Sequence, residues 1–189
     1  MKKILRAKAL RMTTRFVILS EAKNLYKEIE MENVEIERKW LIQDPPVNLE
    51  SYECLEIEQA YLSSSPTVRV RKENDYYYLT YKSSGKESTD TSMSRTEYNL
   101  PLDRESYEHL REKKDGMLIS KKRYLIPDRN GLKIELDVFD APYEGLMVAE
   151  VEFESLEDAK AYDPPKWFGK DVTEDPKYKN AVMAKGWTK

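Results

Sequence analysis

Short runs that alternate between apolar and polar residues dominate the chain from residue 32 onward. Because successive side chains of a β-strand point to opposite faces, this period of two predicts strands rather than helices. Turn signals separate the runs, among them Asn130-Gly131, a dipeptide that favours tight hairpins. We expect eight strands, at about 33–42, 55–63, 67–73, 76–83, 93–101, 117–126, 131–139 and 146–154.

Three further segments are patterned as helices, at about 103–114, 155–162 and 176–185. Asp103, two residues after Pro101, is suited to cap the first helix, and Pro176 opens the third. Neither a GxGxxG motif nor a P-loop occurs, so a glycine-rich phosphate loop is not expected. Strands that follow one another with few helices predict a mainly β fold of the α+β class.

The first thirty residues differ in composition from the rest, with eight basic side chains against three acidic ones. A targeting peptide, an RNA-binding arm, a disordered tail and translated upstream sequence are all compatible with this composition. Met31 stands directly before a well-patterned strand, which favours a start there. We therefore expect 1–30 to be a disordered or non-native leader without assigned function, and 31–189 to form one domain.

Composition narrows the possible chemistry of this domain. The 189 residues carry 35% charged side chains but a net charge of only -3, which argues against a nucleic-acid partner. Cys54 is the only cysteine and His109 the only histidine, so a disulfide, a cysteine-based zinc site and Ser-His-Asp catalysis are excluded. No apolar run is long enough to span a bilayer. We expect a soluble, cytoplasmic protein without a membrane partner, in which any metal is bound by carboxylates.

Charged residues recur at every second position of the predicted strands and therefore share one face. Most of these faces carry a single sign, as in the arginine pair of the third strand and the glutamate pair of the last. Gln59 and Tyr61 on the second strand continue the pattern only if they face the same side. The shared faces carry Glu35, Glu37 and Lys39; Arg69 and Arg71; Thr80 and Lys82; Arg95 and Glu97; Lys121 and Arg123; Lys133, Glu135 and Asp137; and Glu150, Glu152 and Glu154.

A half-exposed sheet with its charges in water would also alternate, and this is the competing interpretation. Two features favour an enclosed charged face instead. The signs are sorted by strand, whereas a solvated surface intersperses them and like charges on one face repel each other. The opposite face is apolar and aromatic, and three helices would cover only part of it. We therefore predict an eight-stranded antiparallel β-barrel with a charged lumen and a few helices packed outside.

A charged lumen calls for charged ligands, because buried charges are costly without partners. Clustered carboxylates suit a hard divalent cation such as Mg²⁺, Mn²⁺ or Ca²⁺. Clustered arginine and lysine suit phosphate or polycarboxylate oxygens. A metal-bound polyphosphate would satisfy both sets together.

The motifs resemble those of the CYTH, or triphosphate tunnel metalloenzyme, superfamily over about 31–187. The ExExK signature, Glu35-Ile36-Glu37-Arg38-Lys39, stands at the start of the first strand, and the other motifs follow in the family's order. These are Gln59-Ala60-Tyr61-Leu62, Arg69-Val70-Arg71, Leu79-Thr80-Tyr81-Lys82, Arg95-x-Glu97, Arg123-Tyr124, Glu135-x-Asp137, Ala149-Glu150-Val151-Glu152-Phe153, Asp171-Val172-Thr173 and Tyr178-Lys179-Asn180.

The resemblance implies a role for each matching residue. Glu35, Glu37, Glu150 and Glu152 should bind one or two Mg²⁺ or Mn²⁺ ions. Phosphate oxygens should be bound by Lys39, Arg69, Arg71, Lys82, Lys121 and Arg123, with Lys179 and Lys170 as further candidates near the tunnel mouth. Glu97, Glu135 and Asp137 should orient basic residues, bind a second metal or position water.

The resemblance is closest to the short bacterial form, which implies metal-dependent hydrolysis of inorganic tripolyphosphate. An adenylyl cyclase of class IV is the alternative, followed by a thiamine, nucleoside or RNA triphosphatase. A non-catalytic polyphosphate-binding protein is disfavoured because all four metal-site glutamates are present. A homodimer is compatible with the sequence. We expect His109 to lie on the surface and Trp40, Trp167 and Trp187 to fill the space between barrel and helices.

Overall fold

A computed structural model describes residues 34–82 and 94–187 of the chain. Apart from Val34 at its edge, these residues belong to one compact unit, Glu35–Lys189. The expectation for residues 1–30 lies outside the described part. The eight predicted strands are confirmed: β1 Val34–Ile42, β2 Glu53–Ser64, β3 Thr67–Glu73, β4 Tyr76–Lys82, β5 Ser94–Leu102, β6 Ile119–Pro127, β7 Lys133–Phe139 and β8 Met147–Glu152.

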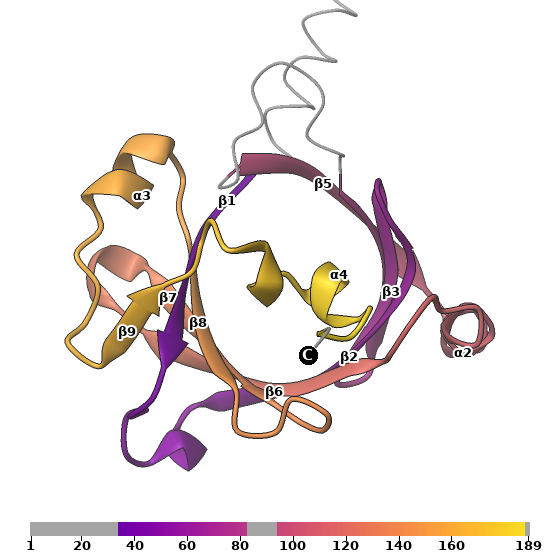
Figure 1. The fold of residues 1–189 in the computed structure, drawn as a ribbon, viewed down its shortest axis with the longest axis horizontal. Helices are drawn as coiled ribbons and strands as arrows, with labels where there is room; N and C mark the ends of the chain where they lie inside the picture. The colour runs from indigo at the N-terminus through magenta and orange to yellow at the C-terminus, as the bar shows by residue number, and fades with distance from the viewer. Residues whose placement is uncertain (1–33, 83–93, 188–189) are drawn as a thin grey trace, which may run out of the picture. The chain divides into compact units, whose positions relative to one another are not determined.

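The strands follow one another around a barrel in the order β5-β4-β3-β2-β6-β7-β8-β1. Neighbouring strands in this order run antiparallel, for example with Lys39 of β1 opposite Glu150 of β8. β5 pairs additionally with β1, so that the eight strands form the ring seen in Figure 1. The predicted barrel is thereby confirmed, and side chains at alternate positions of every strand point to its interior.

A ninth strand, β9 (Phe168–Asp171), was not predicted. It pairs with the second half of β1, with Trp40 opposite Asp171 and Ile42 opposite Phe168. Its four residues, Phe-Gly-Lys-Asp, are too few to show a period, and the element depends on its long-range pairing. β1 therefore has β8 along one edge and both β5 and β9 along the other.

The first two predicted helices are confirmed as α2 (Arg104–Arg111) and α3 (Leu156–Ala161). The carboxylate of Asp103 caps α2 by accepting a hydrogen bond from the backbone N–H of Ser106. The third predicted helix is wrong in extent: a 3₁₀ turn, η3 (Pro176–Tyr178), precedes a short α4 (Asn180–Met183). Lys179 between them has an extended backbone (φ -79°, ψ 124°), which interrupts the helix. Two further 3₁₀ turns are η1 (Leu49–Ser51) and η2 (Arg129–Gly131).

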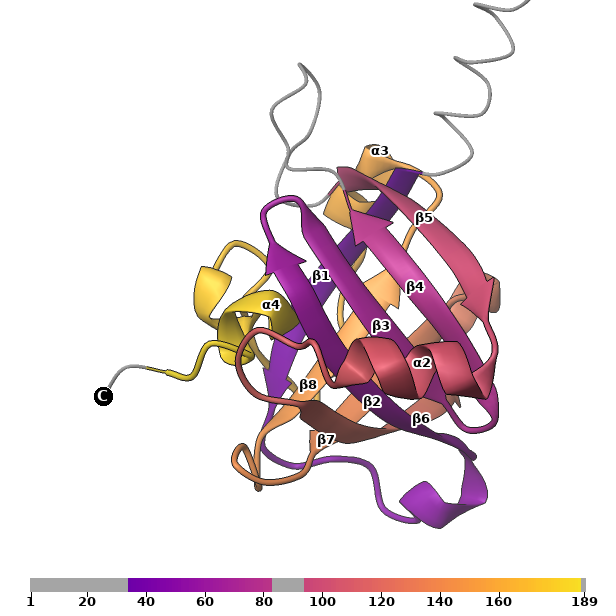
Figure 2. The ribbon, with the colours of Figure 1, turned by 90° about the vertical axis from the view of Figure 1, so that its right-hand side faces the viewer.

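The predicted turn at Asn130-Gly131 is confirmed, since it joins the antiparallel strands β6 and β7. Both residues have positive φ angles, 59° and 76°, a conformation that asparagine and glycine adopt more readily than other residues. Two helices lie outside the barrel, and Figure 2 shows α2 lying across its strands. In contrast, α4 lies across one end of the ring in Figure 1.

Three apolar clusters hold these elements together. The largest packs Trp40 of β1 against Tyr162 and Phe168, between the barrel wall and the segment around α3 and β9. A second cluster lies beneath α2 around Tyr107. The third joins Met183 of α4 to inward residues of the strands and includes Trp187 among its partly buried members. One end of the lumen is therefore apolar, and the rest of its wall is free to carry charge.

Candidate active site

Every strand from β1 to β8 contributes polar side chains to one cavity of about 230 Å³ inside the barrel. Within 34–82 and 94–187, no aliphatic side chain lines it. Its lining includes most of the predicted site residues together with four for which no role was predicted. The lining residues are Glu35, Glu37, Lys39, Gln59, Arg69, Arg71, Glu73, Tyr78, Lys82, Glu97, Asn99, Arg123, Glu135, Glu150, Glu152 and Asn180.

An adjoining cavity of about 70 Å³ lies where the lumen meets the segment before α4. It shares Glu35, Glu37, Lys39 and Arg69 with the larger cavity and adds Tyr61, Thr173 and Lys179. Lys179 therefore lines the lumen, and its binding of phosphate stays a prediction. Lys170 instead lines a separate surface hollow with Arg38 and Lys160, so its expected reach to the tunnel mouth is wrong.

β1 and β8 place the predicted metal ligands next to each other. Glu37 is directly opposite Glu152, and Lys39 is directly opposite Glu150. The Lys39 ammonium lies 2.5 Å from Glu150 Oε1 and 3.0 Å from Glu37 Oε1. Although burial alone would lower it, Glu150 and Glu37 raise the pKa of Lys39 above its usual range. Lys39 is therefore a fixed cation between two carboxylates.

β6 and β7 form the most deeply buried charged cluster of the site. Lys121 and Asp137 have fully buried side chains and form an ion pair. Asp137 also accepts hydrogen bonds from Arg123, at 2.7 Å from Nε and 2.8 Å from Nη2. Arg123 continues to Glu135 and, at 2.6 Å, to Glu150. Asp137 thus orients two basic residues. Burial and the nearby charge of Arg123 outweigh the attraction of Asp137 and lower the pKa of Lys121 to about 8.

β3 brings two arginines into the lumen, each with a hydrogen-bond donor that the described residues leave unused. Arg69 and Arg71 are 7% and 8% exposed, and the Nε–H of each is buried without a hydrogen-bond partner among the described residues. Arg71 reaches Glu73 at 2.6 Å, and Tyr78 donates to the same carboxylate at 2.9 Å. Burial, followed by repulsion from Arg123 and Arg69, lowers the pKa of Arg71. Crowded guanidiniums with free donors are a ready anion site.

Gln59 and Tyr61 of β2, which carry no charge, face the lumen as the barrel requires. Gln59 is 1% exposed and Tyr61 2% exposed. The Tyr61 hydroxyl donates to Gln59 Oε1 at 3.0 Å, and Arg69 Nη1 lies 3.4 Å from the same oxygen. These uncharged groups therefore hold Arg69 in place.

β4 and β5 add a coupled group of two carboxylates and one ammonium. Lys82 binds both Glu35 and Glu97, the latter at 2.6 Å. Burial and then the neighbouring Glu37 raise the pKa of Glu35 to about 8. Although burial alone would raise it, Lys82 and Arg69 lower the pKa of Glu97 to about 2. Glu97 is accordingly a permanent anion and a weak base, whereas Glu35 holds its charge reluctantly.

The carboxylate oxygens of the site are the ligand type that a hard divalent cation prefers, but among the described residues they do not converge on one point. Crowding is evident at Glu152, whose pKa is raised by burial and then by Glu135 and Glu37, and at Glu35. Within 34–82 and 94–187, no three carboxylate, histidine or cysteine side chains converge to hold a metal. Three of the four predicted ligands are already bound: Glu35 by Lys82, Glu37 by Lys39, and Glu150 by both Lys39 and Arg123. A metal would relieve the repulsion by displacing these internal partners.

Four lining residues were missed although the period of two contained the signal. Glu73 continues the face of Arg69 and Arg71, Tyr78 the face of Lys82, and Asn99 the face of Glu97. Extending each face by one more position would have found them. Asn180 belongs to α4, and only the folded chain shows that it reaches the lumen. The side chain of Arg95 lies outside the described part.

The residues given no function in the sequence stay away from the lumen. His109 is exposed on α2 and Cys54 is an exposed free thiol. Trp40 and Trp167 pack between the barrel wall and the segment around α3 and β9, and Trp187 packs against Tyr143, as predicted. Among the described residues, none of the helices has the length and apolarity that a membrane crossing requires.

The fold and the site define a β-barrel with an enclosed tunnel of paired acidic and basic side chains. The CYTH domain model matches residues 33–179, and the chain belongs to this family, as its motifs predicted. An inorganic triphosphatase of Nitrosomonas europaea is 37% identical over 153 residues, covering 79% of this chain and 96% of that protein. An inorganic triphosphatase of Acetivibrio thermocellus is 35% identical over 160 residues, covering 80% and 93%. A crystal structure of an inorganic triphosphatase, 34% identical, matches with a TM-score of 0.60 and covers 81% of this chain and 95% of that one.

Proposed function

We propose that the chain is a metal-dependent hydrolase of linear triphosphates, with inorganic tripolyphosphate as its substrate. The observation that carries this proposal is the pair of buried guanidiniums, Arg69 and Arg71, whose Nε–H groups have no hydrogen-bond partner in the part of the chain that the structure describes. Phosphate oxygens are the acceptors that such donors bind best. The two relatives named as inorganic triphosphatases support the same activity.

The lining of the cavity favours an inorganic substrate over a nucleotide. A nucleobase binds by stacking and apolar contact together with a few polar groups. Among the described residues, the lining of the larger cavity includes no aliphatic side chain and one aromatic side chain, Tyr78, which directs its hydroxyl to Glu73. The Arg71 guanidinium lies over the Tyr78 ring, 5.6 Å from its centroid, and would compete with a base for that face.

In this proposal Glu35, Glu37, Glu150 and Glu152 bind one or two Mg²⁺ or Mn²⁺ ions. The bound ion supplies charge neutralisation and polarisation of phosphate oxygens. Arg69, Arg71 and Arg123 bind the phosphate oxygens, with Lys39, Lys82 and Lys179 as further cations. They stabilise the negative charge that moves onto the leaving oxygen. Lys121, which is fully buried against Asp137, contributes its charge without contacting the substrate.

Glu97 orients the attacking water, because a carboxylate with a pKa of about 2 accepts a hydrogen bond but takes up a proton poorly. Water adds to the terminal phosphorus, the bond to the bridging oxygen breaks, and orthophosphate and pyrophosphate leave. The proton of the water passes to solvent. Glu135 and Asp137 orient Arg123 and Lys121. A cytoplasmic location and a homodimer stay predictions from the sequence.

The test compares release of phosphate and of cyclic AMP from tripolyphosphate, ATP and thiamine triphosphate, with Mg²⁺ or Mn²⁺ and after chelation. We expect metal-dependent phosphate release from tripolyphosphate. Glu37→Gln should nearly abolish turnover without unfolding the chain, whereas Glu144→Gln, an exposed loop position, should have no effect. Full activity of Glu37→Gln, or cyclic AMP from ATP with tripolyphosphate ignored, would refute the assignment.

A further inference from the structure

Lys39 is held in place both by its side chain in the lumen and by its backbone. Its ammonium contacts Glu37 and Glu150 inside the tunnel, while its backbone faces the other edge of β1. There the Lys39 carbonyl accepts a hydrogen bond from the N–H of Val172 at 2.8 Å. The Lys39 N–H donates to the hydroxyl oxygen of Thr173 at 3.0 Å. Both backbone groups of Lys39 therefore depend on the residues that follow β9.

The Thr173 hydroxyl takes a place that a strand partner would normally fill. β9 ends at Asp171, so its ladder supplies no carbonyl opposite the N–H of Lys39. A buried backbone N–H needs an acceptor, and a side-chain oxygen serves where the ladder ends. Thr173 is 6% exposed, so water does not readily replace it.

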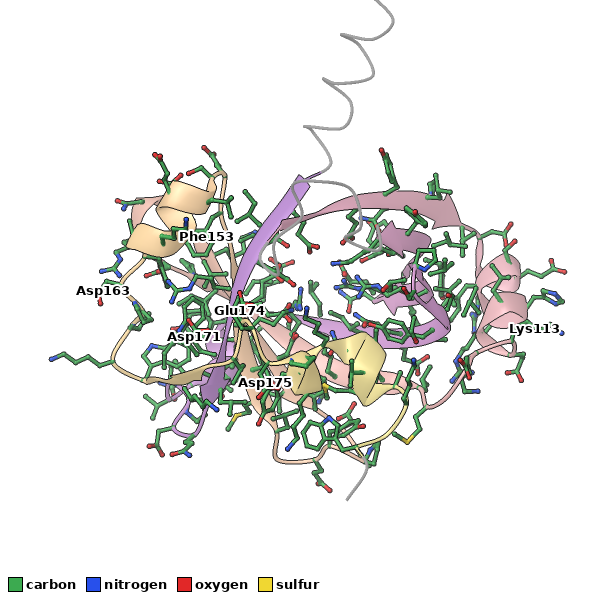
Figure 3. All side chains as sticks on the ribbon, turned by 45° about the horizontal axis from the view of Figure 1, so that its top comes forward. Lys113, Phe153, Asp163, Asp171, Glu174 and Asp175 are labelled. Carbon is green, nitrogen blue, oxygen red and sulfur yellow. The ribbon has the colours of Figure 1, made fainter. Side chains whose placement is uncertain are left out.

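Asp171 fixes the orientation of that hydroxyl. Its Oδ1 accepts hydrogen bonds from the Thr173 hydroxyl at 2.7 Å and from the Thr173 N–H at 2.9 Å. Its Oδ2 accepts from Arg38 at 2.6 Å. Because the hydroxyl proton goes to Asp171, its lone pairs are left for Lys39. Figure 3 shows Asp171 at the base of the segment that carries Glu174 and Asp175.

Arg38 joins this arrangement to the outer layer, the segment of α3 and the residues after it outside the barrel wall. Its Nη1 donates to the backbone carbonyls of Ala159 at 2.8 Å and Tyr162 at 3.2 Å. The guanidinium also lies over the ring of Trp40, 4.7 Å from its centroid. A continuous set of hydrogen bonds thus runs from the α3 region through Arg38, Asp171 and Thr173 to the backbone of Lys39.

We propose that Thr173 is a positioning residue for Lys39, and that Asp171 holds the Thr173 hydroxyl in the orientation this requires. Without the hydroxyl, the N–H of Lys39 loses its acceptor and the strand shifts to find another. The ammonium keeps its charge but leaves the geometry that it shares with Glu37 and Glu150. This inference rests on the proposed function, in which Lys39 contacts the phosphates.

The test measures kcat and KM for tripolyphosphate, and the unfolding temperature, in a set of single variants. Thr173→Val keeps the shape and β-branching but removes the hydroxyl. Loss of such a supporting partner should lower kcat by about tenfold or more, with a smaller change in KM, because the cation remains but is misplaced. Thr173→Ser should restore most of kcat, and Asp171→Asn should give an intermediate loss.

Tyr162→Phe is the matched control, because it removes a hydroxyl that binds Asp128 at 2.7 Å in the same outer layer without contacting Lys39. It should leave kcat unchanged. An unaltered kcat in folded Thr173→Val would overturn the inference, as would equal losses in Thr173→Val and Tyr162→Phe. If Thr173→Val does not fold, Asp171→Asn decides by the same criterion. Lys39→Met separates the two proposals: full activity there would refute the phosphate-binding role of Lys39 itself.

Discussion

The buried pair of Lys121 and Asp137 offers the sharpest test of how the charged tunnel is held together. Both side chains are fully buried, and Asp137 also accepts two hydrogen bonds from Arg123. Asp137→Asn keeps the shape but removes the charge that both cations share. Removing one partner of a buried ion pair costs about 3–5 kcal/mol, so we expect a loss of that order in the free energy of unfolding at neutral pH.

An upper limit follows from the protonation of Lys121. An unpaired lysine can release its proton, and from a folded pKa of about 8 this costs about 1.4 kcal/mol at pH 7. Lys121 therefore accounts for at most about that share of the loss. The rest falls on Arg123, which keeps its charge and loses the charge of Asp137.

The lowered pKa of Lys121 also fixes the sign of the pH dependence. The folded pKa of Lys121 is about 8, below its unfolded value of 10.5. Between these values the unfolded chain holds a proton that the folded chain has released, so this group contributes stability that rises with pH. Asp137→Asn lowers the folded pKa further. The difference in free energy of unfolding between the wild type and Asp137→Asn should therefore narrow as the pH rises to about 8 and then stay constant.

Urea unfolding of both proteins at a series of pH values measures these quantities. Asp140→Asn is the control, since Asp140 is exposed and accepts a hydrogen bond from Ser120. Its effect should stay within about 0.5 kcal/mol, as for most surface changes. A loss below about 1 kcal/mol for Asp137→Asn at pH 6, or a deficit that grows with pH, would contradict a buried pair of this kind.

Two further changes test the anion site and the docking of β9. Arg71→Ala removes an unpartnered donor and a charge, and should weaken tripolyphosphate binding by roughly tenfold to a hundredfold, as charge-assisted bonds are worth about 1.5–3 kcal/mol; an unchanged KM would exclude Arg71 from the substrate site. Gly169→Ala places a Cβ 2.6 Å from the backbone oxygen of Leu41 and should destabilise the protein by about 1–3 kcal/mol, seen as a lower unfolding temperature. An unchanged unfolding temperature would show that β9 moves freely away from β1.

Local patterns were sufficient to predict the barrel wall. The eight strands and their inward faces follow from a period of two, which each strand carries within its own residues. Turn residues such as Asn130 and Gly131 mark the connections just as locally. The family resemblance then supplied the roles of residues such as Glu37 and Arg71. These parts of the fold needed no knowledge of distant contacts.

Features that depend on long-range pairing could not be predicted in the same way. β9 is a strand because four residues lie against β1, and α4 reaches the lumen because Met183 packs onto the inner wall. The hydrogen bond from Lys39 to Thr173 joins residues 134 positions apart. Nor could the sequence say which cation binds which carboxylate, since that depends on strand order and register.

The tunnel's internal pairing also changes what the sorting of charges by sign implies. In the sequence, strands with like charges on one face appeared to need a ligand, because such faces repel themselves. In the fold, the strands surround a common lumen and supply partners to one another: Lys39 binds Glu150 on the neighbouring strand, and Lys82 binds Glu97. Sorting by sign is therefore accounted for largely by these pairs and is weak evidence for a ligand. The stronger evidence is what the pairs leave over among the described residues, namely the Nε–H groups of Arg69 and Arg71, which have no hydrogen-bond partner, and the crowded carboxylate of Glu152. These two remainders have opposite charge, which is the combination that a metal-bound triphosphate would neutralise.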